Sequence, residues 1–203
     1  MNIIEVRADE KALLHAVTAV HMETFPGFFL TFMGKGFLQK MYLSYCEYGE
    51  AALLAAVEDG RVLGFLAYAC DMSGLYKYMI RNHLFAFARY SAGAFFRKPS
   101  VFMRLLRAFL KPSETKREEA YVELASIGTA PAAKQSGIGT ALIDALKARV
   151  DFAKYAYITL ETDAVDNEEV NRFYQKNGFT LARTYETREG RKMNEYRYRK
   201  GDA

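Results

Sequence analysis

The feature that most constrains the fold is an unbroken strand, glycine-containing turn and helix between residues 121 and 150. Residues 121–127 form an apolar strand, and the turn that follows contains Gly137 and Gly139. The helix predicted over residues 141–150 carries four apolar side chains on one face, Leu142, Ile143, Leu146 and Val150. A helix N-terminus offers unpaired N–H groups and a partial positive charge. The pattern therefore predicts an α/β unit whose turn approaches a phosphate or pyrophosphate group.

Spacing separates the families that use such a turn. A Walker loop needs Gly-Lys-Ser/Thr, which this sequence does not contain. A dinucleotide fingerprint needs a third small residue in register, and Ala141 falls one residue away from that position. A plain strand-to-helix turn without a ligand is a further alternative, which this stretch alone leaves open.

The turn resembles the acyl-CoA loop of the GNAT superfamily of N-acetyltransferases, whose pattern is Gln/Arg-x-x-Gly-x-Gly/Ala after a strand and a proline. Pro131 precedes the matching residues here, and Lys134 stands where the family favours Gln or Arg. The resemblance implies acetyl-CoA as the co-substrate, with loop contacts to its pyrophosphate. The implied CoA-binding residues of the loop are Lys134, Gln135, Ser136, Gly137, Ile138, Gly139 and Thr140.

Residues 167–179 resemble the second GNAT signature, in which an Asn lies seven residues before a Tyr that precedes Gly-Phe. The matching residues are Asn167, Tyr174 and Gly178-Phe179. The resemblance implies that Asn167 contacts the pantetheine arm and that the Tyr174 hydroxyl lies near the sulfur. A phenol with an ordinary pKa near ~10 can protonate a departing thiolate. The alternative is that Tyr174 is an aromatic core residue of an amphipathic helix.

The strand before the loop supplies the other implied catalytic group. Glu123 lies eleven residues before Lys134, where several GNAT enzymes carry a glutamate that deprotonates the acceptor amine. Thr129, two residues before Pro131, matches the residue whose backbone N–H polarises the acetyl carbonyl, and Ile127 and Gly128 flank it. The competing interpretation places Glu123 on a polar, outward-facing side of the strand.

The remaining sequence predicts an ordered set of elements around this unit. We expect strands over residues 3–7, 51–58, 62–70, 156–162, 179–188 and 192–200, helices over residues 9–24 and 30–48, and a further helix within residues 167–179. Asp9 is the expected N-cap of the first helix. The dipeptides Asp59-Gly60 and Glu189-Gly190 are expected hairpin turns. The expected fold class is therefore α/β, a mixed sheet with helices on both faces, in one domain over residues 1–203.

Composition narrows the class further. With 203 residues, two cysteines and three histidines that form no ligand motif, the chain predicts no disulfide framework and no metal site. Charge appears too early for a signal peptide, and no apolar run is long enough to span a membrane. We therefore expect a soluble cytoplasmic protein, either a monomer or a homodimer.

One long insertion departs from the common GNAT pattern. Residues 72–111 lie between the third and fourth predicted strands and predict a hairpin of two helices that breaks near Pro99. From Asp71 to Arg117 there are ten Lys or Arg and two acids, a net charge of +8. Three interpretations compete: a solvated packing element, a cover over the acceptor cleft that recognises an anionic substrate, or a surface for acidic membranes or nucleic acid. The absence of a known nucleic-acid module disfavours nucleic acid.

A second local stretch, residues 21–29, falls where GNAT proteins line the acceptor site. Phe25, Phe28 and Phe29 could wall a pocket there, and His21 or Glu23 could contact the acceptor. Together the residues predict an N-acetyltransferase that moves an acetyl group to a small-molecule primary amine, with an anionic amino sugar as one candidate. A non-catalytic acyl-CoA-binding module and an enzyme acting on a protein amine are the alternatives.

Overall fold

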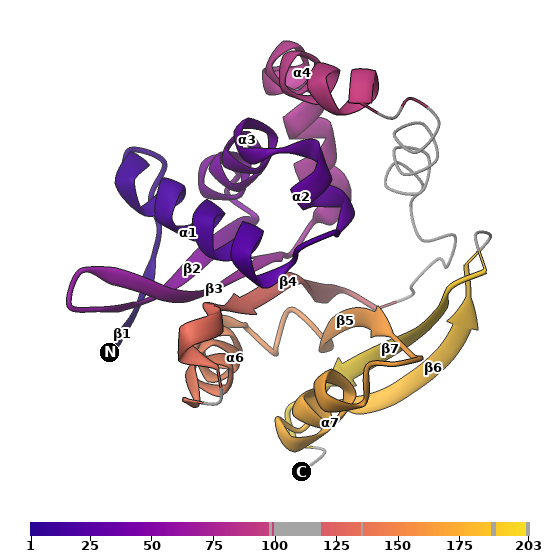
Figure 1. The fold of residues 1–203 in the computed structure, drawn as a ribbon. Coiled ribbons are helices and arrows are strands. Elements are labelled where there is room, and N and C mark those ends of the chain that lie inside the picture. The colour runs from indigo at the N-terminus through magenta and orange to yellow at the C-terminus, as the bar shows by residue number, and fades with distance from the viewer. Residues whose placement is uncertain (98, 100–118, 135, 188–189, 202–203) are drawn as a thin grey trace.

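A computed structural model describes residues 1–97, 99, 119–134, 136–187 and 190–201 of the chain. Seven strands form one sheet in the order β1-β2-β3-β4-β5-β7-β6 (Figure 1). All neighbouring strands are antiparallel except β4 and β5, which are parallel. The strands are β1 Asn2–Glu5, β2 Ala51–Glu58, β3 Arg61–Ala69, β4 Tyr121–Thr129, β5 Tyr157–Asp163, β6 Thr180–Glu186 and β7 Lys192–Tyr198.

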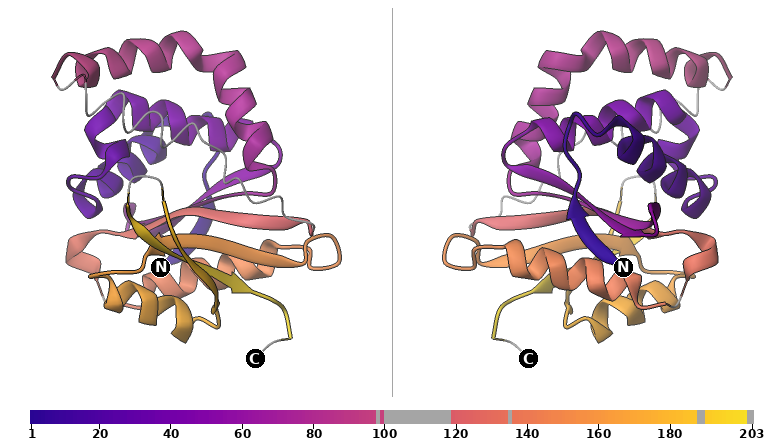
Figure 2. Two further views of the ribbon diagram at one scale, coloured as in Figure 1. Left: turned by 90° about the vertical axis from the view of Figure 1, so that its right-hand side faces the viewer. Right: turned by 90° about the vertical axis from the view of Figure 1, so that its left-hand side faces the viewer.

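Helices cover both faces of this sheet, as the sequence predicts. One group of the described helices lies on one face and a second group lies on the other (Figure 2). The first group is α1 Lys11–Thr24, α2 Phe29–Met33, α3 Lys35–Glu47 and α4 Met72–Arg97; the second is α6 Ile138–Arg149 and α7 Glu168–Lys176. A short 3-10 helix, η1 Pro131–Ala133, follows β4. The predicted α/β class and the helix inserted between the third and fourth strands are both confirmed.

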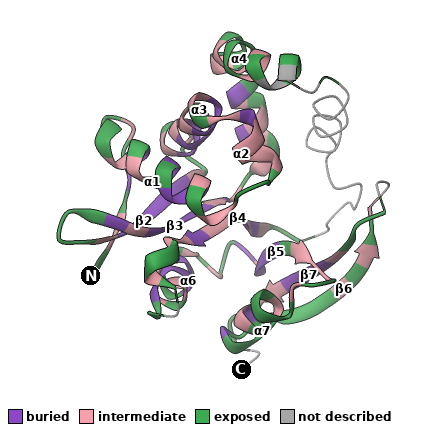
Figure 3. Cartoon of the chain, viewed as in Figure 1, coloured by how far each residue is buried: buried purple, intermediate pink, exposed green. Residues whose placement is uncertain are grey.

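Each face has its own apolar core. Leu38, Tyr42 and Phe65 are fully buried between the sheet and the first group of helices. Leu142, Ile158 and their neighbours form the second core beneath the other face. Figure 3 shows the buried residues gathered in the central strands and on the helix sides that face them. The central strands are therefore buried on both sides, which explains their nearly continuous apolar sequence.

Local sequence explains where several elements turn or end. Asp59 and Gly60 have φ angles of 49° and 74°, the two positive values that a tight hairpin between β2 and β3 requires. Gly34, at φ 100°, divides the single helix predicted over residues 30–48 into α2 and α3. The predicted cap at Asp9 is wrong, because α1 begins after Glu10 and has no side-chain cap. The Glu10 carboxylate instead accepts the Arg7 N–H at 2.8 Å.

The insertion begins with one long helix, α4. Its inner side packs on α3 and α2, where Leu75 and Met79 are buried. The second predicted helix of the hairpin, up to residue 111, falls on residues 100–118, which lie outside the described part of the chain. The described half of the insertion therefore lies on the same face as α1, α2 and α3.

The side chain of Asn171 fastens α7 to the sheet. Its amide nitrogen donates to the Asp163 carbonyl at the end of β5, at 3.0 Å. Its amide oxygen accepts hydrogen bonds from the Asn194 amide and the Tyr196 hydroxyl of β7, each at 2.9 Å. One half-buried amide thus joins α7 to two strands.

We expect Asn171→Ala to lower the free energy of unfolding by about 2 kcal/mol, because it removes the acceptor of two donors on β7, the Asn194 amide and the Tyr196 hydroxyl. For a chain of this size, that corresponds to a melting temperature about 4–8 °C lower. Asn82→Ala is the matched control, since Asn82 is exposed on α4 and makes one local hydrogen bond. Thermal unfolding of both variants measures the difference, and equal losses would contradict the role assigned to Asn171.

Candidate active site

The site begins at an irregularity in β4. The pairing of β3 with β4 passes from Ala67↔Ser126 to Tyr68↔Leu124, so Ala125 is an extra residue, a β-bulge. Parallel pairing of β4 with β5 stops at Glu123↔Thr159, although both strands continue beyond these residues. The two parallel strands therefore separate immediately after Glu123.

The bulge also changes which backbone groups face the separation. Ala130 donates its N–H to the Leu63 carbonyl at 2.8 Å, so the backbone N–H of Ala130 points toward β3. Because bonding alternates along an antiparallel pair, the N–H groups of Ile127 and Thr129 point away from β3, toward the separation. The Thr129 carbonyl, on that same side, accepts a hydrogen bond from the Thr24 hydroxyl at 2.9 Å. Gly128 is buried against Phe25 and Phe65.

The helix N-terminus predicted to bind pyrophosphate is α6, and it starts one turn earlier than the sequence suggested. Gly137 is its cap, in the left-handed conformation at φ 80°, and no side chain caps the helix. Ala141 donates the first intrahelical hydrogen bond, to Gly137. The first turn is therefore residues 138–140, whose N–H groups precede that bond. Lys134 and Ser136 are exposed beside this turn, and Gln135 lies outside the described residues.

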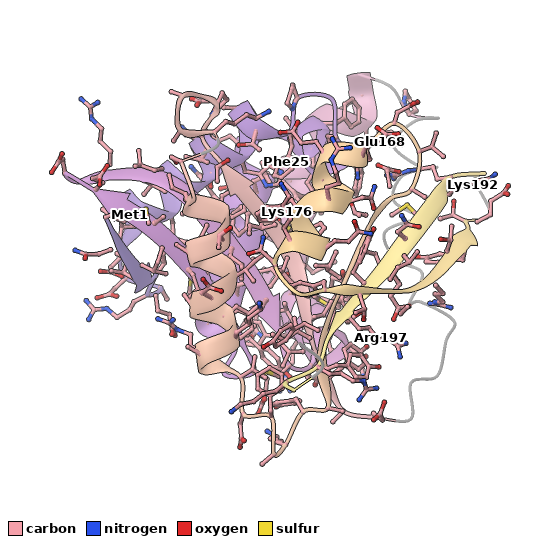
Figure 4. The ribbon with its side chains drawn as sticks, turned by 90° about the horizontal axis from the view of Figure 1, so that it is seen from below. Met1, Phe25, Glu168, Lys176, Lys192 and Arg197 are labelled. Atoms are coloured by element: carbon pink, nitrogen blue, oxygen red, sulfur yellow. The ribbon has the colours of Figure 1, made fainter. Side chains whose placement is uncertain are left out.

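The two glycines of the loop serve different needs. A Cβ at Gly137 would meet no atom within 4 Å, so its requirement is the left-handed backbone. A Cβ at Gly139 would lie 2.9 Å from the Phe173 ring of α7. Figure 4 shows α7, between the labelled Glu168 and Lys176, alongside α6. The contact at Gly139 therefore sets how closely the two helices approach.

Tyr174 and Asn167 lie on this same face of the sheet. Tyr174 is only 6% exposed and packs against Phe173, Phe179 and Tyr196. Burial raises the pKa of its hydroxyl well above the ordinary value, so it stays protonated. The side-chain amide of Asn167 donates hydrogen bonds to the Thr162 hydroxyl and the Asp163 carbonyl, which connects the start of α7 to β5.

Glu123 points to the opposite face, into a cavity of about 100 Å³. The cavity lies between β4, α3 and α4, where Tyr45 and Tyr76 accompany the carboxylate. Burial, and then the nearby Glu123 carboxylate, raises the pKa of Tyr76 to about 12. Glu123 is half-buried, so the predicted outward-facing alternative does not describe it. Neither Tyr45 nor Tyr76 is among the residues that the sequence predicts for the site, because neither belongs to a GNAT-like stretch.

His21 belongs to the core beside this cavity rather than to its lining. It is 3% exposed, and its Nδ1 lies 2.6 Å from the Tyr42 hydroxyl in a hydrogen bond. Its ring packs between Phe25 and Phe65, and its Nε2 is buried without a partner among the described residues. Burial lowers the pKa of His21 to about 4. Of the predicted acceptor-lining residues, Phe28 is largely exposed.

The described residues show few other groups suited to chemistry. Within them, no cluster of three or more His, Cys, Asp or Glu side chains is placed to hold a metal ion. Among the same residues, no helix has the length and apolar character needed to cross a membrane. Cys46 and Cys70 are free thiols.

Comparison with known proteins identifies the class. A sequence profile described as the Acetyltransferase (GNAT) family matches residues 14–179. The chain therefore belongs to the GNAT family of acetyltransferases, enzymes that use acetyl-CoA. No curated protein sequence matches this chain.

Solved structures share the fold at low identity. An aminoglycoside 6'-acetyltransferase type Ii is 16% identical with a TM-score of 0.62, covering 98% of this chain and 97% of its own. The ribosomal-protein-S18-alanine N-acetyltransferase of Escherichia coli is 14% identical with a TM-score of 0.57, covering 98% and 92%. An N-acetyltransferase from Staphylococcus aureus Mu50 is 14% identical with a TM-score of 0.59, covering 98% and 99%. These similarities show the fold alone.

We expect Gly139→Val to lower both stability and CoA affinity, because its side chain collides with Phe173 and displaces the first turn of α6. Gly137→Ala, which meets no neighbouring atom, should cost only about 1 kcal/mol of stability through its positive φ. Thermal unfolding and CoA calorimetry measure the two effects. A Gly139→Val protein with wild-type stability would contradict the packing role of this glycine.

The buried His21 predicts a specific pH dependence of stability. Its folded pKa is depressed, so between pH 6.5 and about 4 the unfolded state binds a proton that the folded state does not. Its contribution therefore lowers the free energy of unfolding as pH falls through this window, by about 2 kcal/mol from pH 7 to pH 5. Urea unfolding of His21→Gln at both pH values should show a correspondingly smaller loss than wild type. An identical loss in both proteins would show that His21 is not the group responsible.

Proposed function

We propose that this protein transfers the acetyl group of acetyl-CoA to the primary amine of a small molecule. The observation that carries the proposal is the separation of β4 from β5 at Glu123. On one face of the sheet lie the uncapped N-terminus of α6 and the buried Tyr174. On the other lies the cavity that Glu123 lines. A reactant bound on each face can meet where the strands part.

The residues at this point divide the chemistry among them. The Glu123 carboxylate accepts a proton from the amine, directly or through one water, so that the nitrogen can attack the acetyl carbonyl. The Ile127 and Thr129 N–H groups face the separation and can stabilise the negative charge that develops on the carbonyl oxygen. When the C–S bond breaks, the protonated Tyr174 hydroxyl can donate a hydrogen bond or its proton to the sulfur.

The CoA body would lie against α6. The N–H groups of residues 137–140 and the helix dipole suit a pyrophosphate. Lys134 and Ser136 are exposed beside them, where they can reach the same group. The side-chain amide N–H groups of Asn167 donate hydrogen bonds to β5. Its side-chain oxygen would then accept a hydrogen bond from the pantetheine arm.

A non-catalytic acyl-CoA-binding module would need the α6 N-terminus but no carboxylate in a facing cavity. The presence of Glu123 there favours the enzyme. The solved relatives are named for an aminoglycoside and for a ribosomal protein, so their names do not choose between small-molecule and protein acceptors. The small volume of the cavity favours the small molecule.

We expect Glu123→Gln to lower kcat by about 10²-fold or more at neutral pH, because it removes the proton acceptor. The loss should shrink at higher pH, where more amine is already deprotonated. Glu119→Gln is the matched control, since Glu119 is exposed and paired with Arg199. The rate of thiol release from acetyl-CoA, with a panel of amines as acceptors, gives kcat for wild type, Glu123→Gln and Glu119→Gln. Superimposable pH–rate profiles for Glu123→Gln and wild type would remove Glu123 from the mechanism.

Tyr174→Phe deletes only a hydroxyl and should lower kcat by about 10²-fold while leaving CoA affinity nearly unchanged. The ring keeps its contacts with Phe179 and Tyr196, so stability should change little. Rates come from thiol release, and affinity comes from calorimetry. A kcat within threefold of wild type would make Tyr174 a packing residue only.

A further inference from the structure

The cavity that Glu123 lines contains a second polar pair, Tyr42 of α3 and Ser126 of β4. Tyr42 is fully buried, and its hydroxyl lies 2.6 Å from Nδ1 of His21 on α1. The Ser126 hydroxyl also interacts with that of Tyr42. Ser126 follows the bulged Ala125, beside the point at which β4 leaves β5. Tyr42 therefore brings a hydroxyl close to the place where the two reactants can meet.

The length of the contact between His21 and Tyr42 indicates which group donates. Hydrogen bonds from an O–H donor are about 2.5–3.0 Å long, whereas those from N–H to oxygen are about 2.7–3.2 Å. At 2.6 Å, the contact fits donation from the Tyr42 hydroxyl to Nδ1 of His21. Burial lowers the pKa of His21 to about 4, so at neutral pH the ring is uncharged and one of its nitrogens can accept. His21 thus fixes the direction of the phenolic hydrogen.

This direction makes the Tyr42 oxygen a hydrogen-bond acceptor. A phenol that donates its one hydrogen can still accept through its oxygen. Burial raises the pKa of Tyr42 well above its ordinary value, and the contact with Ser126 acts in the opposite direction, as a donor to that oxygen does. The hydroxyl therefore stays protonated, and its oxygen can accept a hydrogen bond from a donor in the cavity.

An attacking amine needs two acceptors to be held in one orientation. A primary amine has two N–H bonds and a lone pair, and the lone pair must point at the acetyl carbon. A single hydrogen bond to Glu123 lets the amine rotate about it, whereas a second fixed acceptor stops that rotation. Glu123 and Tyr42 line the same cavity of about 100 Å³, so one nitrogen can reach both.

We propose that the Tyr42 oxygen accepts the second N–H of the acceptor amine, and that His21 is the positioning residue that holds Tyr42. This inference rests on the proposed function and refines the same site. In the transfer, the nitrogen lone pair forms the C–N bond and one N–H proton goes to Glu123. The C–S bond breaks, its electron pair leaves with the CoA sulfur, and overall one proton passes from nitrogen to sulfur. The N–H bonded to Tyr42 stays intact and becomes the N–H of the amide product.

Tyr42 then selects primary over secondary amines. A secondary amine has a single N–H, which Glu123 takes, so a carbon atom would face the Tyr42 oxygen. That oxygen would lose the hydrogen bond that a primary amine provides. Removing the Tyr42 hydroxyl should therefore harm primary amines and leave secondary amines nearly unaffected.

The intact chain and three amine pairs test this selection. The primary amines are butylamine, tyramine and alaninamide, each compared with its N-methyl counterpart. Tyr42→Phe should lower kcat/KM for the primary amines by about tenfold, the value of one hydrogen bond, and change the N-methyl amines by less than about twofold. Tyr45→Phe is the matched control, because Tyr45 lies on the same helix and lines the same cavity, but its hydroxyl contacts the Met72 sulfur at 3.9 Å. It should leave the ratio of primary to N-methyl amine unchanged.

Variants of His21 test the positioning role and decide the matter where transfer to N-methyl amines is too slow to measure. An Asn side chain can place its amide oxygen near the position of Nδ1, whereas Leu offers no acceptor. His21→Leu should lower kcat/KM for the primary amines by about tenfold, and His21→Asn should restore it to within about threefold of wild type. Nitrogen-15 NMR of the wild-type protein should show the His21 ring hydrogen on Nε2. A hydrogen on Nδ1, or equal losses in the two variants, would overturn the proposal.

The outcomes separate this inference from the proposed function. No loss in Tyr42→Phe, or equal losses for primary and N-methyl amines, would overturn the role of Tyr42 and leave the acetyltransferase assignment intact. Absence of transfer to all three primary amines, in a wild-type protein that calorimetry shows to bind acetyl-CoA, would overturn both.

Discussion

The β-bulge at Ala125 is the constraint on which the site depends. Before it, β4 pairs with both neighbours; after it, β4 stays with β3 and leaves β5. One extra residue reverses which N–H groups face each neighbour, so those of Ile127 and Thr129 turn toward the separation. Unpaired backbone groups in the middle of a sheet would cost stability if they stayed buried and unbonded. A ligand with its own amide and carbonyl groups can satisfy them.

The two faces of the sheet then acquire separate tasks. Asn171, Phe173 and Gly139 fix α6 and α7 against each other and against β5 and β7, which positions the α6 N-terminus. On the opposite face, α3 and α4 build an apolar and aromatic wall around Glu123. The inserted helix α4 thus contributes to the site through its inner side, while Lys77, Arg81 and Arg89 on the same helix are exposed.

Much of this arrangement is visible in the sequence because it depends on local patterns. The two GNAT-like stretches, the Asp59-Gly60 turn and the amphipathic helices all predict their elements from neighbouring residues. Three features are not local. The bulge at Ala125 appears only when β4 is paired with β3, Asn171 connects residues far apart in sequence, and Tyr45 reaches Glu123 only through packing. The side of α4 that faces the Glu123 cavity is also set by packing, which the charge pattern of residues 71–117 does not show.

Amide hydrogen exchange along β4, measured by NMR with and without CoA, tests the central claim most directly. In the free protein, the Ile127 and Thr129 amides should exchange quickly, whereas those of Ser126 and Gly128, bonded to β3, should be protected. Addition of CoA should slow exchange at Ile127 and Thr129 and leave the other two unchanged. Protection of all four amides in the free protein, or no change at Ile127 and Thr129 on saturation with CoA, would contradict the account.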